Sequence, residues 1–148
     1  MTTPFKIRKL TEEDLSAWKI LWKEYLHFYG ATLSDEITNH TFHKLISADN
    51  DAGAFVICDE TNKSIGFLHY ILQGNTWSLY PKCYLQDLYV SESFRKNGCA
   101  RLLIEHLDCL AKKNKWSGIY WITKHDNITA RSLYDKIAKK TDWVRYEL

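Results

Sequence analysis

A strand that runs straight into a glycine-containing turn and then a helix constrains this chain more than any other feature. The strand covers residues 84–90, and the turn reads Arg95-Lys96-Asn97-Gly98-Cys99-Ala100. A helix N-terminus carries unsatisfied N–H groups and about half a positive charge, so it stabilises a bound phosphate. Gly98 permits a backbone conformation that a side chain would penalise. The segment therefore predicts a pyrophosphate cradle at the junction of a strand and a helix.

The helix that follows the turn supports this interpretation. Apolar side chains recur with the spacing of one helical face, at Ala100, Leu103, Ile104, Leu107, Leu110 and Ala111. This period predicts an amphipathic helix over residues 98–114 that buries one side against a sheet. The turn has one glycine and no Gly-Lys-Ser/Thr, so it is neither a dinucleotide fingerprint nor a Walker loop. An ordinary basic turn that caps a core helix is the alternative.

A second strand-to-helix junction lies near the C-terminus. An alternating run of β-branched and aromatic residues over 118–123 leads to Asn127, a residue typical of helix N-caps. Tyr134 comes seven residues later, which at about 3.6 residues per turn returns it to the same helix face two turns on. A tyrosine on a helix usually serves packing alone. With the phosphate turn upstream, Tyr134 becomes a candidate catalytic residue.

Composition and charge limit the classes of protein and of partner that this sequence fits. The chain has 148 residues, 45% hydrophobic and 14% aromatic, which favours one folded domain over residues 1–148 and excludes disorder. No apolar run is long enough for a membrane span, and 20 basic against 18 acidic side chains argue against a nucleic-acid partner. The four cysteines lack metal-site spacing, and the first residues do not follow a signal-peptide pattern. We expect no metal, reduced thiols and a cytoplasmic location.

The pattern along the chain predicts an α/β fold. We expect strands at 5–10, 54–58, 64–72, 82–91, 118–123 and 143–148, and helices at 11–29, 34–47, 98–114 and 128–138. The strands at 54–58 and 64–72 form a hairpin. The expected architecture is a single domain with a mixed, mostly antiparallel sheet flanked by about four helices.

The turn resembles the Arg/Gln-x-x-Gly-x-Gly/Ala signature of the GCN5-related N-acetyltransferase (GNAT) superfamily, and the element order matches that fold over essentially the whole chain. Longer sequence motifs resemble those of the small yeast and bacterial members that include the yeast histone/polyamine and D-amino-acid N-acetyltransferases. These motifs are Trp18-x-x-Leu21-Trp22-x-x-Tyr25-x-x-Phe28-Tyr29, Tyr84-x-x-Asp87-Leu88-Tyr89-Val90 and Tyr120-Trp121-x-Thr123-x-x-x-Asn127-x-x-Ala130-x-x-Leu133-Tyr134.

The resemblance implies acetyl-CoA as cosubstrate and assigns residues to it. The strand main chain and Asn127 would hold the pantetheine arm, and the turn would hold the pyrophosphate. The implied acetyl-CoA-binding residues are Leu88, Tyr89, Val90, Arg95, Lys96, Asn97, Gly98, Cys99, Ala100 and Asn127. In the superfamily, the tyrosine that matches Tyr134 points at the thioester sulfur.

Acetyl transfer to an amine needs a base and an acid. A free alkylamine has a pKa of about 10.4 and must lose a proton before it attacks, while the leaving thiolate gains from a donor. We assign Tyr134 as general acid and expect main-chain N–H groups near Leu88 to polarise the carbonyl. Related polyamine enzymes often carry Glu where this chain has Gln86, which cannot accept a proton. Asp87 or a water relay is then the base, unless Asp87 only makes structural hydrogen bonds.

Strand alternation places Gln86 on the same face of the sheet as Leu88, and Asp87 on the other face, unless a β-bulge changes the alternation. His69 and His125 are expected to be ordinary hydrogen-bonded polar residues.

An aromatic stripe on the first helix predicts the acceptor site. Trp22, Tyr25 and Tyr29, with Gln86, are the candidate substrate-binding residues, although such a stripe is also typical of core. The acidic neighbours Glu24, Asp35 and Glu36 would favour a cationic amine. We expect a small primary amine, a polyamine or an amino acid. Acetylation of protein or histone lysines and a non-catalytic acyl-CoA sensor stay open as alternatives.

The resemblance also implies a homodimer. Its edge would be the apolar final strand, residues 143–146, which alternatively completes the sheet of its own chain.

Overall fold

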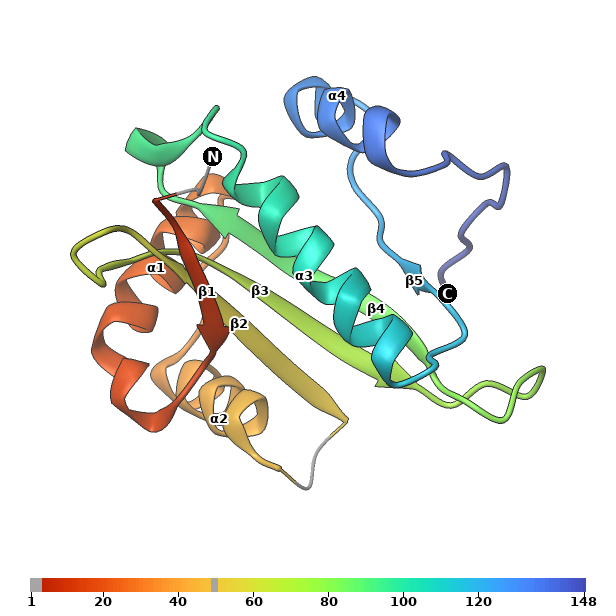
Figure 1. Ribbon diagram of the computed structural model, residues 1–148, viewed down its shortest axis with the longest axis horizontal. Coiled ribbons are helices and arrows are strands. Elements are labelled where there is room, and N and C mark those ends of the chain that lie inside the picture. The colour runs from red at the N-terminus through yellow and green to blue at the C-terminus, as the bar shows by residue number, and fades with distance from the viewer. Residues whose placement is uncertain (1–3, 49–50) are drawn as a thin grey trace.

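A five-stranded sheet forms the centre of the computed structural model, which describes residues 4–48 and 51–148. The strand order is β1-β2-β3-β4-β5 (Figure 1). The strands are β1 (Lys6–Lys9), β2 (Ala52–Cys58), β3 (Ser64–Gln73), β4 (Lys82–Val90) and β5 (Ile119–Tyr120). The three pairings among β1, β2, β3 and β4 are antiparallel, and β5 runs parallel to β4. The mixed, mostly antiparallel sheet predicted from the sequence is confirmed.

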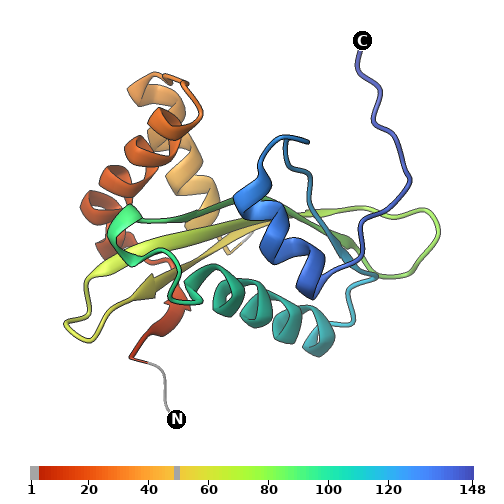
Figure 2. The same cartoon turned by 90° about the horizontal axis from the view of Figure 1, so that it is seen from above.

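In the part of the chain that the structure describes, four helices cover the sheet on both faces. They are α1 (Leu15–Phe28), α2 (Asp35–Ile46), α3 (Cys99–Lys113) and α4 (Ile128–Ile137), and two short 3-10 turns, η1 (Glu12–Asp14) and η2 (Glu92–Phe94), precede α1 and α3. Figure 2 shows α1 and α2 on one face and α3 on the other. Within the described residues, no helix combines the length and hydropathy needed to cross a membrane.

Each face of the sheet has its own hydrophobic core. Alternation along β2 sends Val56 to the core under α1 and α2, and Phe55 and Ile57 to the core under α3. Leu103 and Leu107, which belong to the periodic face of α3, are fully buried. The amphipathic pattern of α3 thus fixes the side that packs on the sheet, and leaves the N-terminus of the helix at the sheet edge.

A β-bulge interrupts the pairing of β3 and β4. His69 is opposite Asp87, but the next residue, Tyr70, is opposite Leu85, so Gln86 has no partner in β3. The extra residue changes the parity of the strand. Leu85 and Leu88 therefore both pack in the core under α3, while Asp87 faces α1.

The predicted strand at 143–148 is wrong. After α4, the described chain forms no further helix or strand, and Trp143 and Tyr146 are 86% and 90% exposed. Aromatic and β-branched residues favour strands because they pack on a pleated surface, but a strand forms only beside a partner strand. The predicted strand at 118–123 shortens to β5 for the same reason, since the chain leaves β4 after Tyr120.

Candidate active site

The last two strands of the sheet separate and leave a gap. β5 pairs with β4 only at Cys83–Ile119 and Tyr84–Tyr120. Beyond these pairs, the segment after β5 bends toward α4 (Figure 1), and residues 85–90 pair with β3 alone. The other edge of β4 therefore presents main-chain N–H and C=O groups. Such an edge can take up an extended chain that carries amides.

A cavity of about 320 Å³ opens at this gap. Its walls come from the C-terminal end of α1, the bulged part of β4, the segment after β5 and α4. The residues that line it are Tyr25, Tyr29, Tyr84, Leu85, Gln86, Asp87, Leu88, Trp121, Ile122, Thr123, Lys124 and Tyr134. The structure thus brings both candidate catalytic residues, Tyr134 and Asp87, to one cavity with three of the four candidate acceptor-site residues.

Tyr134 sits in the cavity wall on α4. Its ring packs edge-to-face on Trp121, with ring centroids 5.3 Å apart. Burial, with a smaller contribution from Tyr29, raises the pKa of the Tyr134 hydroxyl to about 12. The hydroxyl is therefore protonated throughout the neutral range and is able to donate a proton.

Asp87 is held by donors from two other elements. The Tyr25 hydroxyl on α1 donates to Oδ1 at 2.7 Å, and His69 Nδ1 on β3 lies 2.9 Å from Oδ2. His69 in turn accepts a hydrogen bond from the indole of Trp18 at 3.0 Å. Burial first, and then Asp87, raise the pKa of both Tyr25 and Tyr29. The cavity wall near α1 therefore contains a fixed carboxylate surrounded by protonated phenols.

His69 is hydrogen-bonded, as expected from the sequence. Its side chain is 2% exposed and stands between Trp18 and Asp87. The residues that meet here are 51 and 18 positions apart along the chain. No local motif could reveal this contact, because only the strand pairing and the docking of α1 create it.

The turn before α3 has the backbone of an anion cradle. Gly98 is the N-cap of the helix with φ +79, and no atom outside its chain neighbours lies within 4 Å of the position that a Cβ would occupy. The first-turn N–H groups of α3 have no partner within the helix, and no acidic side chain is in that turn. This open, left-handed turn fits a pyrophosphate that approaches the main chain.

Two side chains of the turn that the sequence assigned to acetyl-CoA binding, those of Arg95 and Asn97, bond to the protein itself. Arg95 donates from Nε to the Val90 carbonyl at 3.0 Å, and its guanidinium lies over the rings of Phe28 and Tyr89. Asn97 donates to the Phe94 and Arg95 carbonyls at 3.1 Å. Both side chains thus stabilise the turn, and the Val90 carbonyl already has a donor. Backbone N–H groups and the exposed Lys96 remain for an anion.

Two more of the residues expected to bind acetyl-CoA, Asn127 and Cys99, have contacts that the sequence did not predict. Asn127 is the N-cap residue of α4, but its side chain makes no capping bond and donates to Thr123 Oγ1 at 3.1 Å. Cys99 is buried, and burial raises the pKa of its thiol. A raised pKa leaves little thiolate at neutral pH, so Cys99 is a poor nucleophile.

Some predicted acceptor-site residues lie elsewhere. Trp22 is 6% exposed and stacks on Trp18 in the core, so it does not line the cavity. Glu24 accepts hydrogen bonds from the hydroxyls of Tyr89 and Ser91. Asp35 and Glu36 lie at the start of α2, away from the residues that line the cavity. Asp87 is therefore the acidic residue in the cavity lining, and Lys124 is a basic one that the sequence did not point to.

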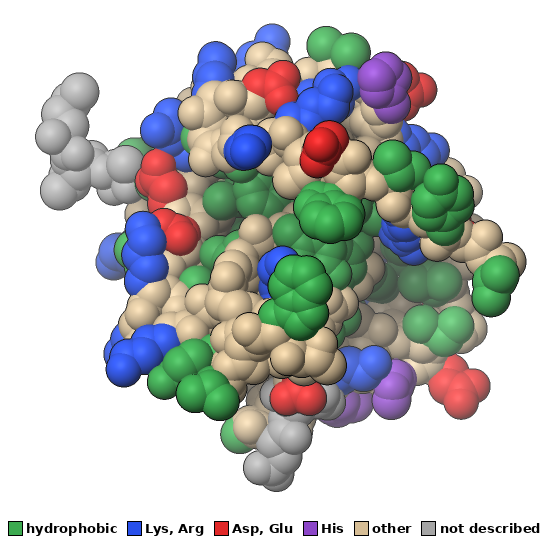
Figure 3. Space-filling view, turned by 90° about the vertical axis from the view of Figure 1, so that its right-hand side faces the viewer, with side chains coloured by type: hydrophobic (Ala, Val, Ile, Leu, Met, Phe, Trp, Pro, Cys, Tyr) green, Lys and Arg blue, Asp and Glu red, His purple; other side chains and the backbone are tan. Residues whose placement is uncertain are grey.

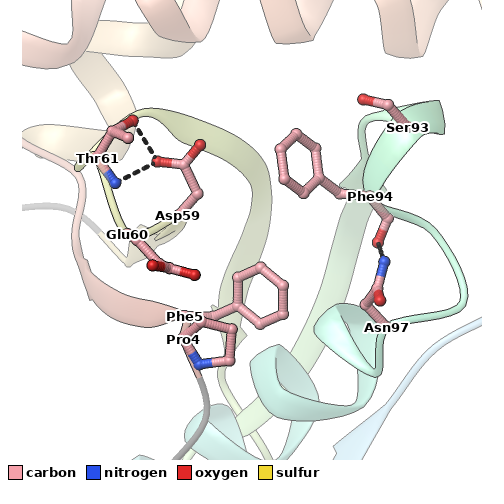
Figure 4. Close-up of a pocket in the computed structure, with 8 residues that line it drawn as sticks. All are labelled: Pro4, Phe5, Asp59, Glu60, Thr61, Ser93, Phe94 and Asn97. Carbon is pink, nitrogen blue, oxygen red and sulfur yellow. Dashed lines mark hydrogen bonds between the residues drawn. The ribbon is translucent and has the colours of Figure 1, made fainter.

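A second hollow of about 400 Å³ lies between the β2–β3 turn and η2, and includes Phe5, Glu60 and Asn97 (Figure 4). Neither Tyr134 nor Asp87 lines it. Asp59 accepts from Thr61 and from the Lys63 N–H, and Glu60 adds a second carboxylate to the lining. Two carboxylates repel a phosphate, so the smaller cavity is the better candidate for acetyl transfer. Among the residues described, no three His, Cys, Asp or Glu side chains come together as a metal site.

Comparison with known proteins agrees with this geometry. The sequence matches the acetyltransferase (GNAT) family over residues 15–138. This chain belongs to the GNAT family. It is 36% identical over 142 residues to the D-amino-acid N-acetyltransferase HPA3 of Saccharomyces cerevisiae, a match that covers 95% of this chain and 88% of the yeast protein.

Solved structures of acetyltransferases share the fold. A probable acetyltransferase superposes with a TM-score of 0.85 at 24% identity, over 97% of this chain and 96% of its own. The aminoglycoside N-acetyltransferase AAC(6')-Iy, solved with CoA, gives 0.83 at 18% identity, over 100% of this chain and 96% of its own. As a GNAT member, the protein is an N-acetyltransferase of class EC 2.3.1, a family that uses acetyl-CoA.

Proposed function

We propose that this protein transfers the acetyl group of acetyl-CoA to the primary amine of a small molecule, by direct attack in a ternary complex. The observation that carries the proposal is the single cavity that places Asp87 and Tyr134 beside the open edge of β4. Acetyl-CoA supplies the acetyl group as a thioester. Its pyrophosphate would lie on the turn at Gly98, and its amides would pair with β4 near Leu88.

The side chains of the cavity carry the proton transfers. Asp87 accepts a proton from the incoming ammonium, directly or through water, so that the nitrogen gains a lone pair for attack. Main-chain N–H groups near Leu88 polarise the carbonyl. Tyr134 donates its proton to the departing sulfur, and the proton that the nitrogen loses as it becomes an amide restores the phenol. One proton leaves in total, the one that Asp87 passes to water.

An amino acid fits the cavity better than a polyamine does. Asp87 and Lys124 line the same cavity, so it offers one anion and one cation. An amino acid carries an ammonium and a carboxylate, whereas a polyamine carries only cations that Lys124 would repel. The 36% identity to a D-amino-acid N-acetyltransferase supports the same class. A cytoplasmic site of action is consistent with the four free cysteines.

Calorimetry of the wild type and of Gly98→Val tests the coenzyme site. The wild type should take up acetyl-CoA with about one ligand per chain. Gly98→Val should lose at least about tenfold in affinity, because a branched residue is strained at φ +79 and its side chain would occupy the open space above the turn. The matched control is Gly74→Val, which also has open space around its Cβ position but lies in the β3–β4 loop. No uptake by folded wild type would remove the basis of the proposal.

An acceptor panel then separates the remaining functions. Thiol release should be fastest with free amino acids, slower with polyamines and slowest with a histone-tail peptide. Preference for the peptide would indicate protein acetylation. Uptake of acetyl-CoA without thiol release for any amine would indicate a sensor.

We also propose a homodimer in which the final segment pairs with a second copy. Apolar side chains gather at this end of the molecule (Figure 3), and Trp143, Val144 and Tyr146 are exposed on a segment with strand-like composition but no partner strand. Large exposed apolar surfaces typically mark an interface.

Light scattering should give about twice the 17.4 kDa chain mass. The double variant Trp143→Ser/Tyr146→Ser should be monomeric, whereas Ile20→Ser, on exposed α1 surface, should stay dimeric. A monomeric wild type at micromolar concentration would contradict this proposal.

A further inference from the structure

A continuous set of hydrogen bonds leads from the core under α1 to the acceptor cavity. Trp18 Nε1 donates to His69 Nε2 at 3.0 Å, and His69 Nδ1 lies 2.9 Å from Asp87 Oδ2. Tyr25 reaches the other carboxylate oxygen at 2.7 Å. Trp18 is 0% exposed and His69 1%, while the Asp87 side chain is 13% exposed at the cavity wall. Three elements, α1, β3 and β4, supply the four residues.

The indole decides which nitrogen of His69 carries the proton. An indole N–H only donates, so His69 Nε2 must accept with its lone pair. The ring is then neutral with its proton on Nδ1, from which it donates to Asp87 Oδ2. The Tyr25 hydroxyl donates to Oδ1. Both oxygens of Asp87 accept from neutral donors, an arrangement that suits an ionised carboxylate.

The surroundings oppose a charged His69. Protonation of Nε2 would break the bond to Trp18 and place a cation among aromatic rings. The ring of Phe67 stacks on His69 with centroids 4.3 Å apart, and that of Trp22 is 5.4 Å away. A buried charge without hydrogen-bond partners is strongly unfavourable. His69 in this form orients Asp87 without adding a positive charge beside it, and Asp87 lines the cavity.

We propose that His69 and Trp18 are positioning residues for acetyl transfer: Trp18 locks His69 as the neutral Nδ1–H tautomer, and His69 thereby keeps Asp87 an uncompensated anion for the acceptor ammonium. The inference rests on the proposed function of Asp87. If His69 became an imidazolium, it would form an ion pair with Asp87 and remove the charge that attracts the amine.

The other titratable groups around the network are phenols, Lys124 in the cavity lining and Glu24. Tyr25 and Tyr29 face Asp87 from α1, Tyr84 lies three residues before it on β4, and Tyr134 and Lys124 line the far wall. Glu24 is engaged with Tyr89 and Ser91. From α2, Phe42 packs on Trp18 and brings no charge to the network.

The variant Trp18→Phe tests the lock, because it keeps an aromatic ring and removes only the N–H donor. His69 Nε2 is then free to take a proton. Protonation of Nε2 would then no longer cost the bond to Trp18, and the resulting imidazolium would pair with Asp87. The ratio of variant to wild-type kcat/KM for the amine should be near one at pH 8.5 and fall severalfold by pH 5.5. The affinity for acetyl-CoA should not change.

NMR of the labelled imidazoles gives a readout that does not depend on turnover. In the wild type, His69 should remain the Nδ1–H tautomer from pH 5.5 to 8.5, and in Trp18→Phe it should titrate. A wild-type His69 that is charged or carries its proton on Nε2 overturns the inference, as does a flat activity ratio.

A second pair of variants covers the case in which Trp18→Phe does not fold. His69→Asn retains a donor close to the Nδ1 position, and His69→Leu has none. We expect His69→Leu to raise KM for the amine about tenfold, and His69→Asn to recover most of that loss. Equal KM values for the two variants overturn the inference. Absence of turnover and of acetyl-CoA uptake in the wild type instead counts against the proposed function, while the NMR result still decides the tautomer.

Discussion

Replacement of Tyr134 by Phe is expected to lower kcat by about 100-fold or more, since general acid catalysis typically contributes about 10²–10⁴-fold. The variant keeps the ring that packs on Trp121 and removes only the hydroxyl in the cavity. Uptake of acetyl-CoA and KM for the amine should change little, because in the proposed mechanism the hydroxyl acts only on the leaving sulfur. Stopped-flow or steady-state thiol release measures the effect directly.

The pH dependence provides a second check on Tyr134. Its pKa is raised to about 12, so the acid form is present at every pH below that value and is lost only above it. Tyr134 should therefore contribute no falling limb to the kcat profile up to pH 10. Tyr80→Phe, in the β3–β4 loop and outside the cavity lining, is the matched control and should behave as wild type. A Tyr134→Phe enzyme with wild-type kcat would show that another group protonates the sulfur.

Local signals predicted the parts of the fold that depend on local physics. The helix predicted at 98–114 is observed as Cys99–Lys113, because its apolar period and its N-terminal glycine both lie within the segment itself. The backbone of the turn follows from the same glycine. Local signals alone do not predict that Tyr134 and Asp87 line one cavity; that prediction also requires the element order of a known fold.

The remaining site details depend on contacts between distant segments. Trp22 and Tyr25 stand three residues apart on the same aromatic stripe, yet Trp22 is core and Tyr25 lines the cavity. The rotation of α1 against β3 makes this distinction, and no spacing within α1 contains it. The bulge at Gln86 likewise arises from the register between two strands. The final segment has strand composition, but composition does not supply a neighbouring strand.

Replacement of Asp87 by Asn should lower kcat/KM for the amine by about 100-fold or more, because in the proposed mechanism Asp87 is both the proton acceptor and the charge that holds the ammonium. The geometry around Asp87 sharpens this expectation. Tyr25 and His69 both donate to the carboxylate, but an asparagine has one acceptor oxygen; if that oxygen stays on His69 Nδ1–H, the asparagine NH2 faces Tyr25, whose hydroxyl must turn from donor to acceptor. A hydrogen bond lost in this rearrangement would typically cost about 1–3 kcal/mol of stability, so thermal unfolding should be measured beside the kinetics.

Two controls separate charge from structure at this position. Asp135→Asn removes the same charge from an exposed position next to Tyr134 and should leave kcat/KM within about twofold, since exposed charges are screened. Tyr25→Phe removes one donor but leaves the carboxylate, so it should disturb the network as Asp87→Asn does while retaining most of the activity. If Tyr25→Phe were as inactive as Asp87→Asn, the hydrogen-bond network would matter more than the charge. If Asp87→Asn kept wild-type kcat/KM, the amine would lose its proton to water alone, and Asp87 would be a structural residue of the β3–β4 bulge.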